Sequence, residues 1–225
     1  MLKCLLGAES EAEHANKYRN CQMQTYSHFI ITAALGRPFK NKSEESDIPE
    51  LERGALLLGS IMPDLPLTFT TIGCIIYDYL NGTLGGPEST VRILFRDWFF
   101  NNPWIKLQHN LFHSPLLDAF YILLGYWLWK RGYKWGAWIF WFAIACMIHT
   151  LIDIPLHYDD GPLLLFPLNW SWRFMSPVSY WDPDHYGMQF TIFEHGLILV
   201  LLVYLLIIYR QAIGGWFRAR VSSKP

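Results

Sequence analysis

The sequence predicts an all-α, polytopic membrane protein with about three to five membrane-embedded helices, and three observations support this. Apolar residues make up 52% of the 225 residues and charged residues only 16%, whereas a soluble domain carries about a quarter charged residues. Several apolar segments approach or reach the roughly 20 residues that cross a bilayer as a helix. Eleven tryptophans are typical of a protein that meets the membrane interface.

The domain organisation follows from where the apolar pattern begins and ends. Residues 1–22 are polar after the first few positions and contain no long apolar core, so they do not indicate a secretory signal. Met23 is followed within a few residues by an apolar stretch. We expect residues 1–22 to be a non-essential extension, residues 23–210 to form the membrane-embedded domain, and residues 211–225 to form a basic cytoplasmic tail.

The elements before residue 110 are short and interrupted. Residues 37–53 form a charged loop. Residues 54–80 are apolar but contain Pro63 and Pro66, which predicts two helical pieces around a break. Residues 81–108 are mixed and rich in Trp and Phe, as at a membrane interface.

Three later segments are predicted to span the membrane, namely residues 115–129, 134–152 and 190–209. Roughly 20 residues cross the hydrocarbon core as a helix, so the second and third segments fit and the first is short. The first contains one acid, Asp118, and the third contains the adjacent pair Glu194 and His195.

Charge gives the orientation of these segments. The 130–134 turn holds three basic residues and no acid, and the tail after residue 209 holds four basic residues and no acid. Residues 153–189 hold five Asp and only one basic residue, Arg173. By the positive-inside rule the first two regions lie in the cytoplasm and residues 153–189 lie outside. The net charge of −1 argues against a nucleic-acid partner, which requires a basic face.

Ionisable residues recur at helical spacing beside the second span. His149, Asp153 and His157 are four residues apart, so on a helix they share one face; Pro155 makes His157 the least regular of the three. Imidazole and carboxylate together suit zinc, manganese or iron. The alternative is a hydrogen-bonded structural pair of His149 and Asp153. Because burial of such groups in a membrane is costly, we favour a divalent metal site at the outer face.

Other candidate ligands lie in three earlier segments. His109 and His113 form a second pair four residues apart, just before the first span, and the topology places them on the same outer side. Asp64 sits at the predicted break, where it is either a helix N-cap or a rigidly held ligand. His28 opens an apolar helix.

Downstream acids and imidazoles on the same side are candidates for the surroundings of the metal. Glu194 and His195 lie about one turn inside a span, where exposure to lipid is costly, so we expect both to face the bundle and to reach the site. The loop residues are either further partners or a solvated loop. These are Asp159, Asp160, Asp182, Asp184 and His185.

Together these motifs resemble a family, the bacterial inner-membrane metal-dependent hydrolases typified by YdjM. The motifs that carry the resemblance run from about residue 23 to 168: His28 before an apolar helix, Pro63-Asp64, His109-x3-His113-Ser114, and His149-x3-Asp153 followed by Gly161 and Leu163–Pro167. That family is similar in pattern to zinc-dependent phospholipase C and the S1/P1 nucleases, which are all-helical phosphoesterases. The resemblance implies a multi-pass protein of a bacterial inner membrane.

The resemblance also implies roles for individual residues. The metal ligands would be His28, Asp64, His113, His149 and Asp153, with His157 as a further ligand and His109 as a ligand or substrate contact. At two positions the sequence departs from the family pattern, and these positions bear on the substrate and on the number of metal ions. Pro66 replaces the second acid of a PDxD motif, and Asn110 replaces the Arg that follows the first His of the HxxxHS block.

The function expected from these residues is metal-assisted hydrolysis of a phosphate ester, such as a phospholipid head group taken from the bilayer. Asp64 or Asp160 would accept the proton of the attacking water. The alternative is a metal-binding membrane protein without turnover, either a transporter or sensor, or a structural or assembly factor. Transport requires ionisable groups near the midplane, and the cytoplasmic halves of residues 134–152 and 190–209 lack acids and histidines.

Overall fold

The computed structural model describes residues 25–36 and 47–222, and within residues 211–222 it describes the backbone alone. Every regular element in these ranges is helical, which confirms the predicted all-α class. The main helices are α2 (Thr25–Leu35), α3 (Arg53–Gly59), α4 (Leu65–Asn81), α5 (Thr90–Ile93), α6 (Phe99–Asn101), α7 (Pro103–Asn110), α8 (Pro115–Lys130), α9 (Lys134–Asp153) and α10 (Gly187–Ser222). A π-helical turn, Leu94–Trp98, joins α5 to α6, and short 3-10 turns lie at Ile154–Leu156 and Pro183–His185.

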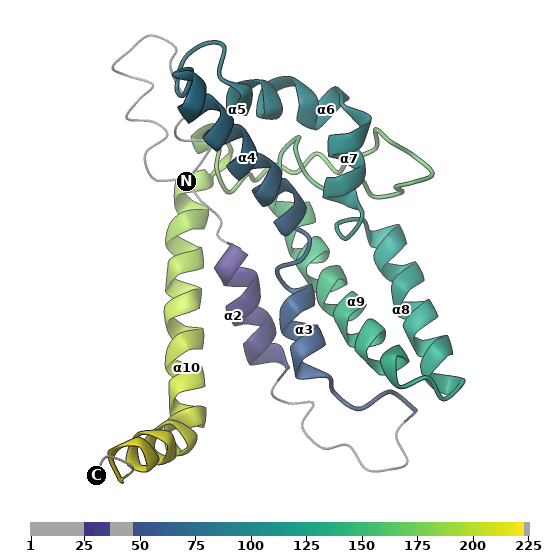
Figure 1. Ribbon diagram of the computed structural model, residues 1–225, viewed down its shortest axis with the longest axis vertical. Helices are drawn as coiled ribbons and strands as arrows, with labels where there is room; N and C mark the ends of the chain where they lie inside the picture. Colours follow the sequence, from purple (N-terminus) through teal and green to yellow (C-terminus); the bar gives the residue numbers. More distant parts are fainter. Residues whose placement is uncertain (1–24, 37–46, 223–225) are drawn as a thin grey trace.

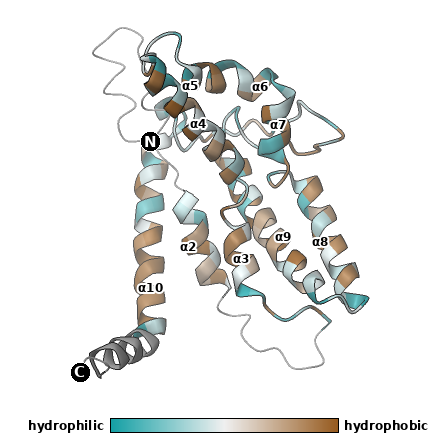
Figure 2. Cartoon of the chain, viewed as in Figure 1, coloured by the Kyte–Doolittle hydropathy of each residue, from teal (hydrophilic) through white to brown (hydrophobic). Residues whose placement is uncertain are grey.

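The helices form two layers (Figure 1). α2, α3, α8, α9 and α10 run lengthwise as a bundle, and α4 to α7 lie over one end of it together with the loop that follows α9. We call this second layer the cap. The apolar residues concentrate along the bundle helices (Figure 2).

α9 lies at the centre of the bundle, between α3 and α8, and glycines allow both neighbours to approach it closely. A Cβ on Gly59 of α3 would collide with the Phe142 carbonyl of α9, and a Cβ on Gly125 of α8 would lie 2.5 Å from the Phe140 nitrogen. Small residues at helix contacts are the usual way in which membrane helices gain packing energy. The close contacts fix the position of the α9 backbone relative to α3, and therefore of the side chains at its end.

Breaks in the helices fall at one level of the molecule, where bundle and cap meet. The predicted break at Pro63 and Pro66 is confirmed, because α3 ends at Gly59 and α4 begins at Leu65. α9 ends at Asp153, since Pro155 has no N–H to continue the helical hydrogen bonds. Residues 81–108, expected as a mixed segment, are helical from Thr90 to Asn101 and again from Pro103.

Among the residues that the structure describes, two helices are long and apolar enough to cross a membrane, Lys134–Leu156 and Gly187–Arg210. They correspond to the second and third predicted spans. The prediction for residues 115–129 needs correction, because α8 is too short by itself and meets the same criterion only together with α7, to which it is bent by 46°. The bend follows from the break before Pro115, where α8 begins.

Candidate metal centre

Side chains from five separate segments converge where the bundle meets the cap. A small cavity of about 100 Å³ lies there, with room for a cation and a few water-sized groups. Most of the sequence-predicted candidates line it. Its polar lining is Thr25, His28, Asp64, His109, His113, Asp153, His157, Asp160 and Tyr180.

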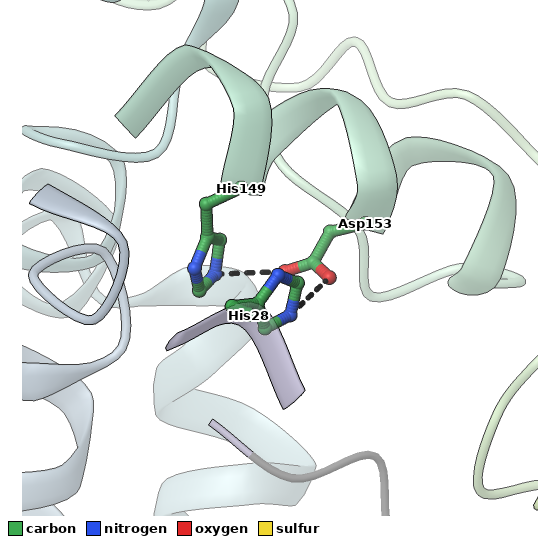
Figure 3. Close-up of side chains that lie close together, drawn as sticks. All are labelled: His28, His149 and Asp153. Carbon is green, nitrogen blue, oxygen red and sulfur yellow. Dashed lines mark ion pairs between the residues drawn. The ribbon is translucent and has the colours of Figure 1, made fainter. Parts of the chain in front are cut away.

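Asp153, at the C-terminal end of α9, is the centre of this arrangement. One carboxylate oxygen lies 3.1 Å from Nε2 of His28, and the other lies 3.0 Å from Nε2 of His113 and 3.1 Å from Nε2 of His149. Figure 3 shows the adjacent rings of His28 and His149, each joined by a dashed line to the Asp153 carboxylate. Asp153 is 3% exposed and His149 is completely buried, so these groups interact without water to screen them.

The tautomer of His149 is fixed by the break that follows α3. Nδ1 of His149 lies 2.7 Å from the carbonyl oxygen of Ser60. A carbonyl only accepts, so Nδ1 carries the proton and donates it. Nε2 faces Asp153 and, at 3.4 Å, Asp64; it presents a lone pair to them when the ring is neutral and donates a hydrogen bond when the ring is protonated.

Positive charge beside the Asp153 and Asp64 carboxylates can come from a proton on one imidazole or from a bound cation. His28 stacks on His149 with ring centroids 3.7 Å apart and an interplanar angle of 19°. Two stacked imidazolium ions would repel each other, so at most one of the two rings carries an added proton. One donor atom from each of His28, His149 and Asp153 lies within 4.8 Å of the others.

These distances fit a divalent metal. Zinc binds His nitrogen and carboxylate oxygen at about 2.0–2.1 Å, so that two tetrahedral ligand atoms lie about 3.3 Å apart. The nitrogen–oxygen distances around Asp153 are 3.0 to 3.1 Å. Several buried ring nitrogens have no hydrogen-bond partner, namely both nitrogens of His109, Nδ1 of His28 and Nδ1 of His113. The residues are therefore able to hold a metal ion.

Asp64 faces this cluster from the break between α3 and α4. It is the residue before α4, but its side chain makes no capping hydrogen bond, so the N-cap alternative is not what its carboxylate does. One oxygen accepts from the Thr25 hydroxyl at 2.7 Å and the other lies near His149. Burial raises the pKa of Asp64, but the charge and hydrogen bond of His149 outweigh burial and hold the pKa below its ordinary range.

His157 enters the cavity from the extended segment after α9, as the position of Pro155 suggested. Its Nε2 is 3.9 Å from Asp153, and its Nδ1 is 2.9 Å from Asp160. The second oxygen of Asp160 accepts from the Trp181 indole at 3.0 Å. Asp160 thus orients His157, as a carboxylate commonly orients an imidazole that ligates a metal.

Sequence reasoning missed Thr25 and Tyr180. Burial, together with the charges of Asp160 and Asp153, raises the pKa of Tyr180 well above its ordinary value, so the phenol stays protonated at neutral pH. Neither residue belongs to a spacing pattern, although Thr25 lies three residues before His28 and on the same helix face.

Asn110, which stands where the family pattern has Arg, has a structural role. It is completely buried, its side-chain oxygen accepts from the Leu163 amide at 2.8 Å, and its side-chain nitrogen donates to the Lys106 carbonyl. Ser114 donates to the Phe166 carbonyl at 3.1 Å. These contacts explain why the His109–Ser114 and Leu163–Pro167 motifs occur together: the second packs on the first and covers the site.

Six downstream candidates, namely Asp159, Asp182, Asp184, His185, Glu194 and His195, lie outside the cavity lining. His195 is exposed, and its Nδ1 contacts the Thr191 carbonyl of its own helix at 2.8 Å; the expectation that it faces the bundle is wrong. Glu194 does face the bundle, but it accepts from Ser27 rather than reaching the cavity. Asp182 accepts from the Asp184 amide and pairs with His185 at 2.9 Å.

Comparison with known proteins gives one family. The family model described as YdjM inner membrane protein matches residues 23–219. No curated protein and no solved structure matches the chain. The expected extension, residues 1–22, lies outside both the matched region and the residues that the structure describes.

Proposed function

The chain belongs to the family of YdjM inner membrane proteins, and from this premise we propose that it is a membrane-bound, metal-dependent hydrolase of a phosphate ester. The observation that carries the proposal is the position of His149. Its Nδ1 donates to the Ser60 carbonyl, so its Nε2 faces the carboxylates of Asp153 and Asp64 in a buried place, where it would bind a cation together with them.

We assign the cation to His28, His149 and Asp153, with His113 and His157 as further ligands. Zinc is the metal that these donors suit best, and manganese or iron would also be accepted. Both oxygens of Asp153 face imidazole nitrogens, so this carboxylate would hold the cation together with them. A bound divalent cation would polarise a phosphoryl oxygen and lower the pKa of its water.

The roles of the remaining residues follow from their contacts. We assign proton acceptance to Asp64 rather than Asp160, because the side chain of Asp160 is only 5% exposed and its two oxygens bind His157 and Trp181. The side chain of Asp64 is 27% exposed, so water can reach it. The protonated Tyr180 phenol can donate a hydrogen bond into the cavity.

We further propose a multi-pass arrangement with the site on the non-cytoplasmic side of a bacterial inner membrane. α9 begins at Lys134 and ends at Asp153, about 28 Å away along a helix, which is close to the roughly 30 Å hydrocarbon thickness. The basic turn at its start, with Lys130 and Arg131, would then face the cytoplasm.

The test measures metal content and hydrolysis together. Purified protein is loaded with zinc or manganese and given lipid phosphodiesters, and His149→Ala is compared with His195→Ala. Both substitutions remove one imidazole, but the second removes an exposed one that contacts only its own helix.

We expect wild type and His195→Ala to bind metal and hydrolyse, and His149→Ala to do neither. Equal rates for wild type and His149→Ala would refute the hydrolase. Bound metal in wild type without turnover on any phosphate ester would support a static structural site instead.

A further inference from the structure

A second, larger cavity lies between α2, α9 and α10. It has a volume of about 600 Å³, within the range of about 300–1,000 Å³ typical of ligand sites. Its walls are almost entirely aliphatic and aromatic. Among the residues that line it are Ile31, Leu35, Leu151, Phe193, Leu197 and Leu201.

The single ionisable residue in this wall does not present a free charge. Glu194 is 3% exposed and accepts from the Ser27 hydroxyl at 2.5 Å. Other wall residues are open to the surroundings: Leu151 is 54% exposed and Phe193 is 63% exposed. A groove of this kind, flanked by two helices that can cross a membrane, faces hydrocarbon rather than water.

The length of the groove matches one leaflet. From Phe190 to Leu201 on α10 the wall extends about 16 Å at the rise of an α-helix. One leaflet contributes about 15 Å of the roughly 30 Å hydrocarbon core. The groove is therefore as deep as an acyl chain of a single leaflet.

The upper end of the groove adjoins the metal centre. Ile152 and Leu156 of the groove wall flank Asp153 and precede His157 in sequence. On the α2 side, Ser27, which binds Glu194 of the groove wall, precedes His28. A chain lying in the groove would thus end beside the centre.

We propose that this groove binds one acyl chain of a membrane phospholipid and thereby presents the phosphate ester of that lipid to the metal centre. The presentation of substrate rests on the function proposed above, whereas binding of the chain does not. The occupant is a lipid of the leaflet that the centre faces, and not a soluble phosphodiester.

The experiment uses the full chain in vesicles of phosphatidylethanolamine and phosphatidylglycerol. A small fraction of the phosphatidylethanolamine carries a photoreactive diazirine in one acyl chain, and cross-linked residues are mapped by mass spectrometry. Two variants fill the groove, Ala34→Phe and Leu201→Trp, so that one remains informative if the other fails to fold. The control, Leu199→Phe, adds the same ring to a position of α10 that is 64% exposed and does not line the groove.

In wild type we expect cross-links at Leu151 and Leu197 to exceed those at Leu199. Each filling variant should reduce the groove cross-links roughly tenfold, with metal content unchanged, and Leu199→Phe should leave them as in wild type. Cross-links spread equally over groove and outer face, or unaffected by both filling variants, would overturn the proposal.

Hydrolysis separates this proposal from the proposed function. If wild type hydrolyses nothing but the cross-linking pattern holds, the hydrolase is refuted and the groove stands. If filling the groove slows hydrolysis of the long-chain phospholipid but not of a short-chain soluble phosphodiester, both stand. If filling changes neither rate, presentation of the substrate by the groove is refuted and the hydrolase stands.

Discussion

Two buried aspartates, Asp153 in the bundle and Asp78 in the cap, have opposite surroundings. Asp78 of α4 is completely buried and accepts from the Ser89 hydroxyl at 2.5 Å and from the amides of Thr90 and Val91. Asp78 therefore caps the start of α5 by accepting from its first amides, although it belongs to a different helix. Asp153 is almost as buried, but imidazoles surround it instead.

The difference shows which buried acids point to a ligand. Amides and hydroxyls supply their own protons, so the carboxylate of Asp78 is satisfied within the protein. A neutral imidazole supplies one proton, and the Nδ1 proton of His149 is donated to the Ser60 carbonyl. Burial alone therefore does not mark a functional acid; the kind of donor around it does.

The largest expected effect separates the two acids by metal content. Asp153→Asn should abolish bound metal and lower hydrolysis more than about 100-fold, because it removes a charge that several imidazoles share. Asp78→Asn should keep the full metal content. Elemental analysis of purified, folded protein measures both, and equal metal content in the two variants would contradict the distinction.

A second effect concerns how closely the helices that carry Asp153 and Asp78 are packed. Gly59→Ala should lower the free energy of unfolding by about 3 kcal/mol, because the new Cβ would collide with α9 at Phe142. Gly73→Ala, on the helix that carries Asp78, meets no atom within 4 Å and should be neutral or gain up to about 1 kcal/mol. Denaturant unfolding in detergent micelles measures both variants. Equal stabilities would show that α3 does not approach α9 this closely.

A third effect tests the cap of α5. Asp78→Asn should cost about 2 kcal/mol of stability at neutral pH, because one side-chain atom changes from acceptor to donor while facing buried donors. The control is Asp97→Asn, since the Asp97 carboxylate binds the exposed Asn101 side chain; it should change stability by less than about 0.5 kcal/mol. A loss as large in the control would show that the effect is general charge removal.

The smallest expected effect is the pH dependence of the stability that the Asp78 carboxylate contributes. Burial raises the pKa of Asp78. The hydrogen bonds from the Ser89 hydroxyl and from the Val91 and Thr90 amides outweigh burial, and they hold the pKa well below its ordinary range. A lowered pKa stabilises the fold above the unfolded-state pKa of about 3.9 and loses that stabilisation as pH falls below it. The stability difference between wild type and Asp78→Asn should be constant from about pH 5 to 8 and then shrink by at most about 1.4 kcal/mol per pH unit. A difference unchanged at low pH would mean that Asp78 does not titrate below its usual range.

The fold class and most of the cluster could be predicted from the sequence because they follow from periodicity. Apolar runs indicated helices, and prolines marked the breaks at which Asp64 and His157 enter the cavity. The four-residue spacing of His149 and Asp153 predicted a shared face, which the structure has.

What could not be predicted depends on neutral groups and on helix rotation. The Ser60 carbonyl that fixes His149, and the hydroxyls of Thr25 and Tyr180, follow no pattern of charge or spacing. Glu194 and His195 were expected to behave alike, yet adjacent residues of a helix point about 100° apart, so one is buried and the other is exposed.

The chain is synthesised from its N-terminus, and all the ligands proposed for the cation come before the last helix. Every side chain that we assign to the cation lies between His28 and His157, and α10 begins only at Gly187. A ribosome has therefore delivered all of these ligands to the membrane before the final helix emerges. Metal uptake can precede insertion of α10, which would then close the lipid-facing side of an already loaded centre.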